Sequence, residues 1–103
     1  MKIILNDIAY ARSGDKGPNS NVGVIFKTKK DYIWALDILT EDCVKNYFGE
    51  IVKGNVERYE LPNLNALNFI LNDSLGGGGS QTLINDAQGK TYGQAILMME
   101  LEK

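Results

Sequence analysis

Seven consecutive residues near the start of the chain, at positions 11–17, concentrate groups that can do chemistry. Arg12 and Lys16 are cations, Asp15 is a carboxylate beside Lys16, and Ser13 adds a hydroxyl. A guanidinium can bind a carboxylate or a phosphate through two parallel hydrogen bonds, whereas an ammonium acts as a point charge. The segment therefore predicts a binding site for an anionic group.

Two amides, Asn19 and Asn21, follow across Pro18 and extend the same segment, which we expect to be a loop. The loop is not a P-loop, because Gly17 is followed by proline rather than by lysine and a hydroxyl residue. The alternative to a ligand site is a surface turn in which Asp15 and a neighbouring cation neutralise each other, a pairing that contributes about 0–1 kcal/mol. The residue types leave both interpretations open.

The second conspicuous feature is a run of four glycines before Ser80: Gly76, Gly77, Gly78 and Gly79. Gly76 can end a helix, with the rest as a connection, or the successive N–H groups can form a nest for an anionic or carbonyl group. We expect this loop to lie beside residues 12–21, so that Arg12, Lys16 and the glycine amides hold one anionic ligand or a partner's acidic group. In that site Asp15 would orient one cation, or act as a base if the domain is catalytic.

Composition limits the remaining chemistry. The chain has 103 residues, a formal net charge of −2 and no histidine, so the commonest general base and metal ligand is missing. We expect no metal and no cofactor, and no catalytic residue is assigned. The net charge argues against nucleic acid as a partner, and no apolar run approaches the roughly 20 residues of a membrane span. The single Cys43 cannot form an internal disulfide, which favours the cytoplasm, and we interpret it as a buried filler rather than a nucleophile.

The elements that must position these segments are strands alternating with helices. Residues 3–10 are expected to form a strand broken at residues 6–7, and residues 22–26 a central strand. Asp31 is expected to cap a helix that reaches Leu39. Thr40 is expected to cap the next helix, which Gly54 would end.

A third strand is expected at residues 55–61, where alternation places Arg58 on the face of Val56 and therefore requires a carboxylate partner. Pro62 is expected to begin a helix that has a leucine at every third or fourth position and ends at the glycine run. Strands are then expected at residues 80–84 and 94–101, with a turn at residues 86–89. The order β-β-α-α-β-α-β-β predicts one α+β domain over residues 1–103, with a largely antiparallel sheet and helices packed on one face.

The last of these strands carries a further expectation. Ile96 and Met98 would make one face apolar, and Leu97 and Met99 the other, so that the strand would need cover on both faces. This pattern predicts a homo-oligomer or cover by another protein.

Five short segments in matching order resemble the AtuA-like ferredoxin-fold domain. They are residues 11–17, Asn21 with Gly23-Val24, residues 56–62, residues 66–69, and Leu75 with the four glycines. The resemblance spans residues 11 to about 101. It implies a ferredoxin-like α/β sandwich without an iron–sulfur cluster, which one cysteine could not hold. Relatives often carry a histidine where this chain has Asn65.

In that family the domain usually forms the C-terminal end of a longer protein linked to acyclic terpene utilisation. The resemblance therefore implies a small stand-alone subunit that binds, or completes a site for, an acyl-CoA or an organic acid beside an AtuA-like large subunit. Two alternatives stay open: an independent small enzyme that acts on an acyl-CoA or an organic acid, and a purely structural homo-oligomer.

Overall fold

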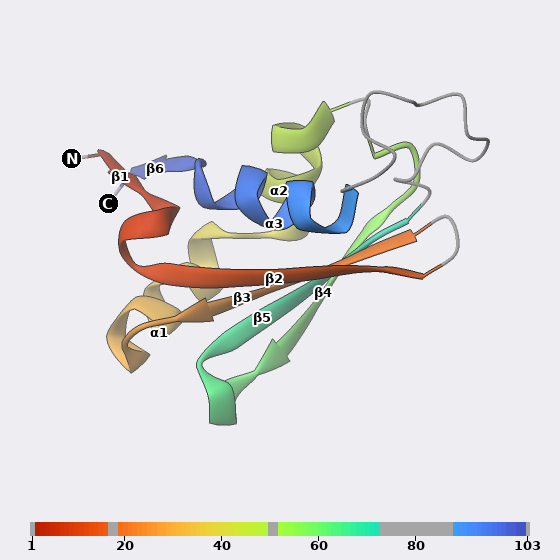
Figure 1. Ribbon diagram of the computed structural model, residues 1–103. Helices are drawn as coiled ribbons and strands as arrows, with labels where there is room; N and C mark the ends of the chain where they lie inside the picture. The colour runs from red at the N-terminus through yellow and green to blue at the C-terminus, as the bar shows by residue number, and fades with distance from the viewer. Residues whose placement is uncertain (1, 17–18, 50–51, 73–87, 103) are drawn as a thin grey trace.

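The computed structural model describes residues 2–16, 19–49, 52–72 and 88–102. The elements follow in the order β1 (Lys2–Ile4), β2 (Ala9–Lys16), β3 (Asn19–Phe26), α1 (Lys29–Ile38), α2 (Glu41–Phe48), β4 (Val56–Leu61), β5 (Ala66–Leu71), α3 (Gln88–Leu97) and β6 (Glu100–Glu102). Four strands form an antiparallel sheet in the order β2-β3-β5-β4. A separate antiparallel pair, β1 and β6, brings the two ends of the chain together (Figure 1).

The helices lie on one face of the four-stranded sheet. Helix α3 packs on β2 and β3, whereas α2 packs beside β4 (Figure 1). Alternate strand residues are fully buried between the two layers: Val22, Val24, Leu67, Phe69 and Leu71. Each such side chain contributes roughly 1.5–3 kcal/mol by leaving water. The expected α+β fold, with a mostly antiparallel sheet and helices on one face, is confirmed, and so is the central position of β3.

Threonines cap the first two helices. Thr28 accepts a hydrogen bond from the Asp31 N–H (3.1 Å), so that α1 begins before Asp31, which lies in its first turn instead of capping it. The Asp31 carboxylate in turn accepts from the Thr28 hydroxyl (3.1 Å). Thr40 caps α2 as expected, because it accepts from the Cys43 N–H (3.1 Å).

Helix α2 ends at Gly49 and not at Gly54. Gly49 has a φ of 62°, a conformation that L side chains rarely adopt. Gly54 lies in the connection to β4, where its N–H donates to the Asn72 carbonyl (2.9 Å). A Cβ on Gly54 would come within 2.8 Å of that same oxygen, so glycine is needed there for a close approach of two backbone segments.

The expected helix after Pro62 is wrong, because residues 66–71 form β5. Pro62 opens only a 3-10 turn, which ends at Leu64 and is followed by Asn65 in the left-handed conformation (φ 52°). In β5 the buried positions alternate and include Leu67, whereas the intervening residues are half-buried or small. Strands β3 and β4 supply hydrogen bonds on both sides of β5, and this tertiary pairing overrides the leucine spacing.

The expected strand at residues 94–101 is also wrong over most of its length. Residues 88–97 form α3, in which Tyr92 and Ile96 are buried one turn apart. The strand begins only at Glu100, although Met99 and Leu101 do point inward as expected. The two-faced strand that suggested an oligomer therefore does not exist. The glycine run and the strand expected at residues 80–84 lie outside the described residues.

Candidate functional site

The segment expected to be a ligand-binding loop is a β-hairpin. Strands β2 and β3 pair from Ala9 opposite Phe26 to Lys16 opposite Asn19. The expected break at residues 6–7 is confirmed as the 3-10 turn Leu5–Asp7, but β2 then continues through Gly14. The polar sequence gave no sign of this strand because its hydrogen bonds come from β3, a partner that lies later in the chain.

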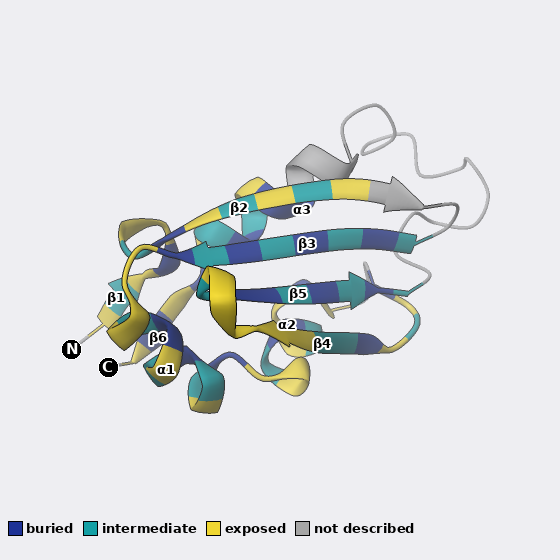
Figure 2. Cartoon of the chain, turned by 90° about the horizontal axis from the view of Figure 1, so that it is seen from below, coloured by how far each residue is buried: buried dark blue, intermediate teal, exposed yellow. Residues whose placement is uncertain are grey.

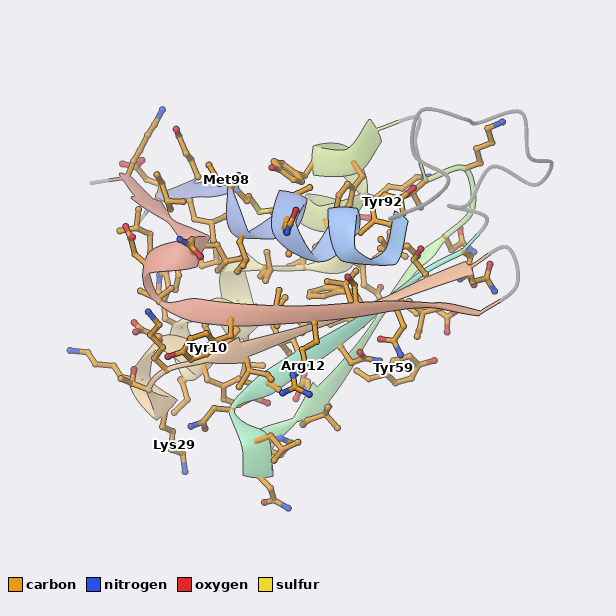
Figure 3. All side chains as sticks on the ribbon, in the orientation of Figure 1. Tyr10, Arg12, Lys29, Tyr59, Tyr92 and Met98 are labelled. Carbon is orange, nitrogen blue, oxygen red and sulfur yellow. The ribbon has the colours of Figure 1, made fainter. Side chains whose placement is uncertain are left out.

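Strand alternation sends two of the expected site residues to opposite faces. Ser13 lies beneath α3, where its Oγ accepts a hydrogen bond from the Gly93 N–H (3.2 Å). Arg12 is exposed on the side of the sheet that faces away from α3 (Figure 3). The structure therefore does not bring the Arg12 and Ser13 side chains together on one surface.

A groove of about 380 Å³ runs along the edge of β2 against α3, and we call it the β2–α3 groove. It is lined by Ala11, Arg12, Ser13, Gly93, Gln94 and Leu97. The helix approaches the strand this closely because Gly93 has no side chain: a Cβ there would lie 2.8 Å from Ser13 Oγ. The groove has the volume of small-molecule pockets. Arg12 contributes to its lining at the β2 edge, although its side chain points to the side of the sheet away from α3 (Figure 3).

The face of the sheet turned away from the helices, called the outer face below, is built from three rows of residues that run from β2 across β3 and β5 to β4. The first row holds Tyr10, Ile25, Ala66 and Leu61; the second holds Arg12, Gly23, Asn68 and Tyr59; the third holds Gly14, Asn21, Ile70 and Glu57. Figure 2 looks onto this face: α2 and α3 lie behind the sheet, and the 3-10 turn Pro62–Leu64 stands in front of it only at the end where β4 is joined to β5.

Large side chains at the two edges of the outer face are in contact with solvent. Tyr10 is 61% exposed, Tyr59 50% and Leu61 41%. Figure 3 shows Tyr10, Arg12 and Tyr59 on the side of the sheet away from α3. Near the centre of the face, Gly23 contributes no side chain.

The two edges of the outer face carry opposite charge. On the β2 edge lies Arg12, which makes no ion pair with any residue that the structure describes, and the Lys27 ammonium sits 5.1 Å from the Tyr10 ring centre. On the β4 edge lies Glu57, whose carboxylate accepts from the Tyr59 hydroxyl (2.6 Å). The edges are thus basic at β2 and acidic at β4.

Hydrogen bonding keeps Glu57 ionised. The Tyr59 hydroxyl and, secondly, the Asn72 amide (2.7 Å) both donate to the Glu57 carboxylate and lower its pKa. A carboxylate with a lowered pKa carries its negative charge throughout the neutral pH range. The same contact raises the pKa of Tyr59, so this hydroxyl remains a donor.

Arg58 points the other way, into the helix layer, as its alternation with buried Val56 predicts. Its Nη1 donates to the carbonyls of Leu36 (2.8 Å) and Leu39 (3.0 Å) at the end of α1. Its Nη2 lies 3.4 Å from the Glu60 carboxylate, so the expected ion pair is confirmed. The main function of Arg58 is nevertheless to bind the last carbonyls of α1, where a cation is favoured.

The titratable groups between the layers belong to the core. Burial raises the pKa of the Cys43 thiol, which lies 4.0 Å from Met99 Sδ, in line with the expectation of an unreactive filler. Burial also raises the pKa values of Tyr32 and Tyr47. The Tyr47 hydroxyl donates to the Ala95 carbonyl (2.6 Å) and so links α2 to α3. These groups support the fold and do not form a reactive cluster.

A larger hollow of about 620 Å³ lies at the end of α2, lined by Lys45, Asn46, Gly49, Val52 and Lys53. The Lys45 ammonium is already engaged, because it donates to the Val52 carbonyl and to the Gly54 carbonyl (2.7 Å). Among the described residues, no three His, Cys, Asp or Glu side chains are grouped as a metal site would require. No described helix is long and apolar enough to cross a membrane.

Of the remaining expected site residues, some are described by the structure and others are not. Asp15 and Lys16 end β2, opposite Ser20 and Asn19, and Asn21 lies in the third row of the outer face. Gly76, Gly77, Gly78 and Gly79 lie outside the described residues, so their expected proximity to Arg12 stays a prediction.

Sequence reasoning missed the partners of Arg12 on the outer face. Tyr10 lies two residues before Arg12 on β2, whereas Asn68 comes from β5 and Tyr59 from β4, and only the pairing register brings these two into the row of Arg12. One signal was present: alternation in residues 56–61 places Glu57, Tyr59 and Leu61 on one face. That face is the outer face.

Comparison with known proteins gives one match. The model of the AtuA ferredoxin-like domain family matches residues 3–102, nearly the whole chain. No curated protein and no solved structure matches the chain.

Proposed function

The chain belongs to the AtuA ferredoxin-like domain family, and on this premise we propose that it is a small, non-catalytic subunit that assembles with other proteins through its outer face. The family resemblance implies an AtuA-like large subunit as a member of the same assembly, and a setting in the catabolism of isoprenoid acids carried as CoA thioesters. In this function the domain completes a protein assembly and does not itself transform a substrate.

The observation that carries the proposal is the outer face, over which none of the helices α1, α2 and α3 in the described part of the chain is packed. Contiguous exposed patches with large apolar side chains mark interaction sites on soluble proteins. Tyrosine and arginine are the residues enriched at the energetic centres of interfaces, and Tyr10, Arg12 and Tyr59 stand on this one face. The helix face, by contrast, is filled by the protein's own core.

The test compares assembly by the wild type and by two single variants. Tyr59→Asp places a charge on the outer face, whereas Met98→Asp, at a position that is 62% exposed beyond the end of α3, is the matched control. Light scattering after size-exclusion chromatography measures the mass of each protein alone and after mixing with an AtuA-like large subunit.

We expect the wild type and Met98→Asp to form the same assembly, and Tyr59→Asp to form it at least about tenfold more weakly, as is common when a tyrosine that anchors an interface is replaced. A wild type that stays monomeric alone and in the mixture contradicts the proposal. Equal effects of the two variants also contradict it, because the outer face would then have no special part in assembly.

The β2–α3 groove supports a second candidate function, binding of an anionic small molecule such as an acyl-CoA or an organic acid. Because β2 is an edge strand, Arg12 would have to turn its guanidinium around that edge to bind an anion in the groove, and the other expected ligand residues at the hairpin and the glycine run would complete the site. Calorimetric titration with acetyl-CoA and with acetate tests this candidate. Arg12→Ala should weaken binding by about tenfold or more, whereas Lys29→Ala, on α1, should not. Undetectable binding of both probes at millimolar concentration would rule this candidate out.

A further inference from the structure

We propose that the outer face is the contact surface of a homodimer, in which a second copy of the chain packs face to face about a two-fold axis that runs parallel to the strands. This inference rests on the proposed function and names the occupant of the same surface. The large subunit would then meet a pair of small subunits and not a single one.

Such an axis has a simple consequence for the three rows. It keeps each row at its own height along the strands and exchanges the two edges of the sheet, so that β2 faces β4 of the second copy and β3 faces its β5. The row order follows from the registers of β2, β3, β5 and β4. Sheets that pack face to face keep their strands within about 30° of each other, so the rows stay near their counterparts.

The side chains brought together in this way are complementary in size. At the centre, the bare backbone of Gly23 faces Asn68 of the second copy, whereas Ile25 faces Ala66, which neighbours in its own chain already cover. At the edges the contact is of a different kind, because Tyr10 faces Leu61 of the second copy and both side chains are large and exposed. Large side chains opposite small ones allow two layers to interdigitate, as in protein cores.

The charges are complementary in the same arrangement. Arg12 on the basic edge faces Tyr59 of the second copy, with Glu57 of the second copy one row further along the strand. Neighbouring rows are about 7 Å apart along the strand, a distance that a long arginine side chain can span. The guanidinium can thus lie on the tyrosine ring and reach the carboxylate, and the symmetry forms this contact twice.

The sheet edges are less suitable for a second copy than the outer face. On β4, the Arg58 N–H already donates to the Glu41 carboxylate (2.8 Å) from the start of α2. On β2, the edge is flanked by α3 along the β2–α3 groove. Pairing of edge strands between copies would have to displace these neighbours, whereas face-to-face packing leaves both of them in place.

The size of the outer face sets the expected strength. Four strands at a spacing of about 4.8 Å, with three rows about 7 Å apart, make a face of roughly 20 by 20 Å. This is at the small end of specific interfaces, where association is weak or transient. We therefore expect a dissociation constant in the micromolar range.

Sedimentation velocity between about 1 µM and 1 mM brackets that range and tests the inference. The variants are Arg12→Glu, Glu57→Arg, and the double variant that carries both changes. Lys29→Glu, an exposed charge reversal on α1, is the matched control. We expect each single reversal to weaken dimerisation by about a hundredfold, tenfold for each of the two symmetric contacts. The double variant should regain most of the loss, and Lys29→Glu should behave as the wild type.

A wild type that remains monomeric at the highest concentration overturns the inference, and so does a double variant that dimerises no better than the single ones. The proposed function is judged separately. If the chain is monomeric but Tyr59→Asp abolishes binding to an AtuA-like large subunit, the outer face is an assembly surface with a different occupant. In that case only the homodimer proposal is wrong. If the wild type associates neither with itself nor with the large subunit, both proposals fall.

Discussion

Replacement of Arg58 by methionine, a side chain of similar length without charge, measures how strongly β4 holds the end of α1. The guanidinium donates to the Leu36 and Leu39 carbonyls at 2.8 and 3.0 Å, and its side chain is 18% exposed. A hydrogen bond from a charged donor contributes about 1.5–3 kcal/mol net. Two such bonds contribute about 3–6 kcal/mol. The net loss is smaller, because the variant no longer has to remove a charge from water and because the methionine side chain still buries apolar surface. We expect a loss of about 2–4 kcal/mol.

The assay is thermal and urea unfolding followed by circular dichroism. For a domain of this length, 1 kcal/mol shifts Tm by about 4–8 °C, so Arg58→Met should lower Tm by roughly 8–30 °C. Glu60→Gln is the control, because this partner is 54% exposed and lies 3.4 Å away, and an exposed pair contributes at most about 1 kcal/mol. Arg58→Lys should fall between the two, since an ammonium cannot fork to both carbonyls as a guanidinium does.

The reasoning is refuted if the free energy of unfolding of Arg58→Met lies within about 0.5 kcal/mol of the wild-type value. The two hydrogen bonds would then contribute far less than expected. It is equally refuted if Glu60→Gln costs as much as Arg58→Met. That result would mean that the ion pair, and not the contact with the helix end, holds Arg58 in place.

Three further predictions follow from single contacts. Gly54→Ala should cost about 1–3 kcal/mol in urea unfolding, because its Cβ meets backbone at 2.8 Å, whereas Gly14→Ala, with open space around it, should be nearly neutral. Cys43 should react with iodoacetamide at pH 8 much more slowly in the native than in the urea-unfolded protein, because burial raises its pKa; equal rates would contradict this. Tyr59→Phe should raise the pKa of Glu57 towards 4.5 in an NMR titration. Ionised Glu57 stabilises the fold at neutral pH, and this stabilisation is lost as the pH falls through the folded-state pKa of Glu57. Because that pKa is higher in Tyr59→Phe, the variant should lose the stabilisation at a higher pH than the wild type.

Local signals predicted the elements that are stabilised locally. The helix after Thr40 was predicted with its cap, because a capping hydroxyl and an apolar stripe lie within a few residues of each other. The face that each residue of β4 occupies was also predicted, since alternation along a strand needs no knowledge of its neighbours. The family was predicted from five short segments in order, and the match over residues 3–102 confirms it.

Two segments were assigned to the wrong element because their apolar spacing fits both periods. Leu64, Leu67 and Leu71 fit a helix, but Leu67 and Leu71 with Phe69 between them fit a strand equally well. In β5 the hydrogen bonds from β3 and β4 decide the outcome. In α3 the burial of Tyr92 and Ile96 against the sheet decides it, although alternation in residues 94–101 favours a strand.

The sequence by itself determined which chemical groups are present near residues 11–17, and that histidine chemistry is not among them. It also determined the fold class, since binary patterning and caps act over short distances. Only the tertiary structure decided that Arg12 and Ser13 lie on opposite faces of one strand, and that Arg12 shares a row with Tyr59. The physical reason is that a row across a sheet is set by the register between strands, which depends on pairings among segments far apart in the chain.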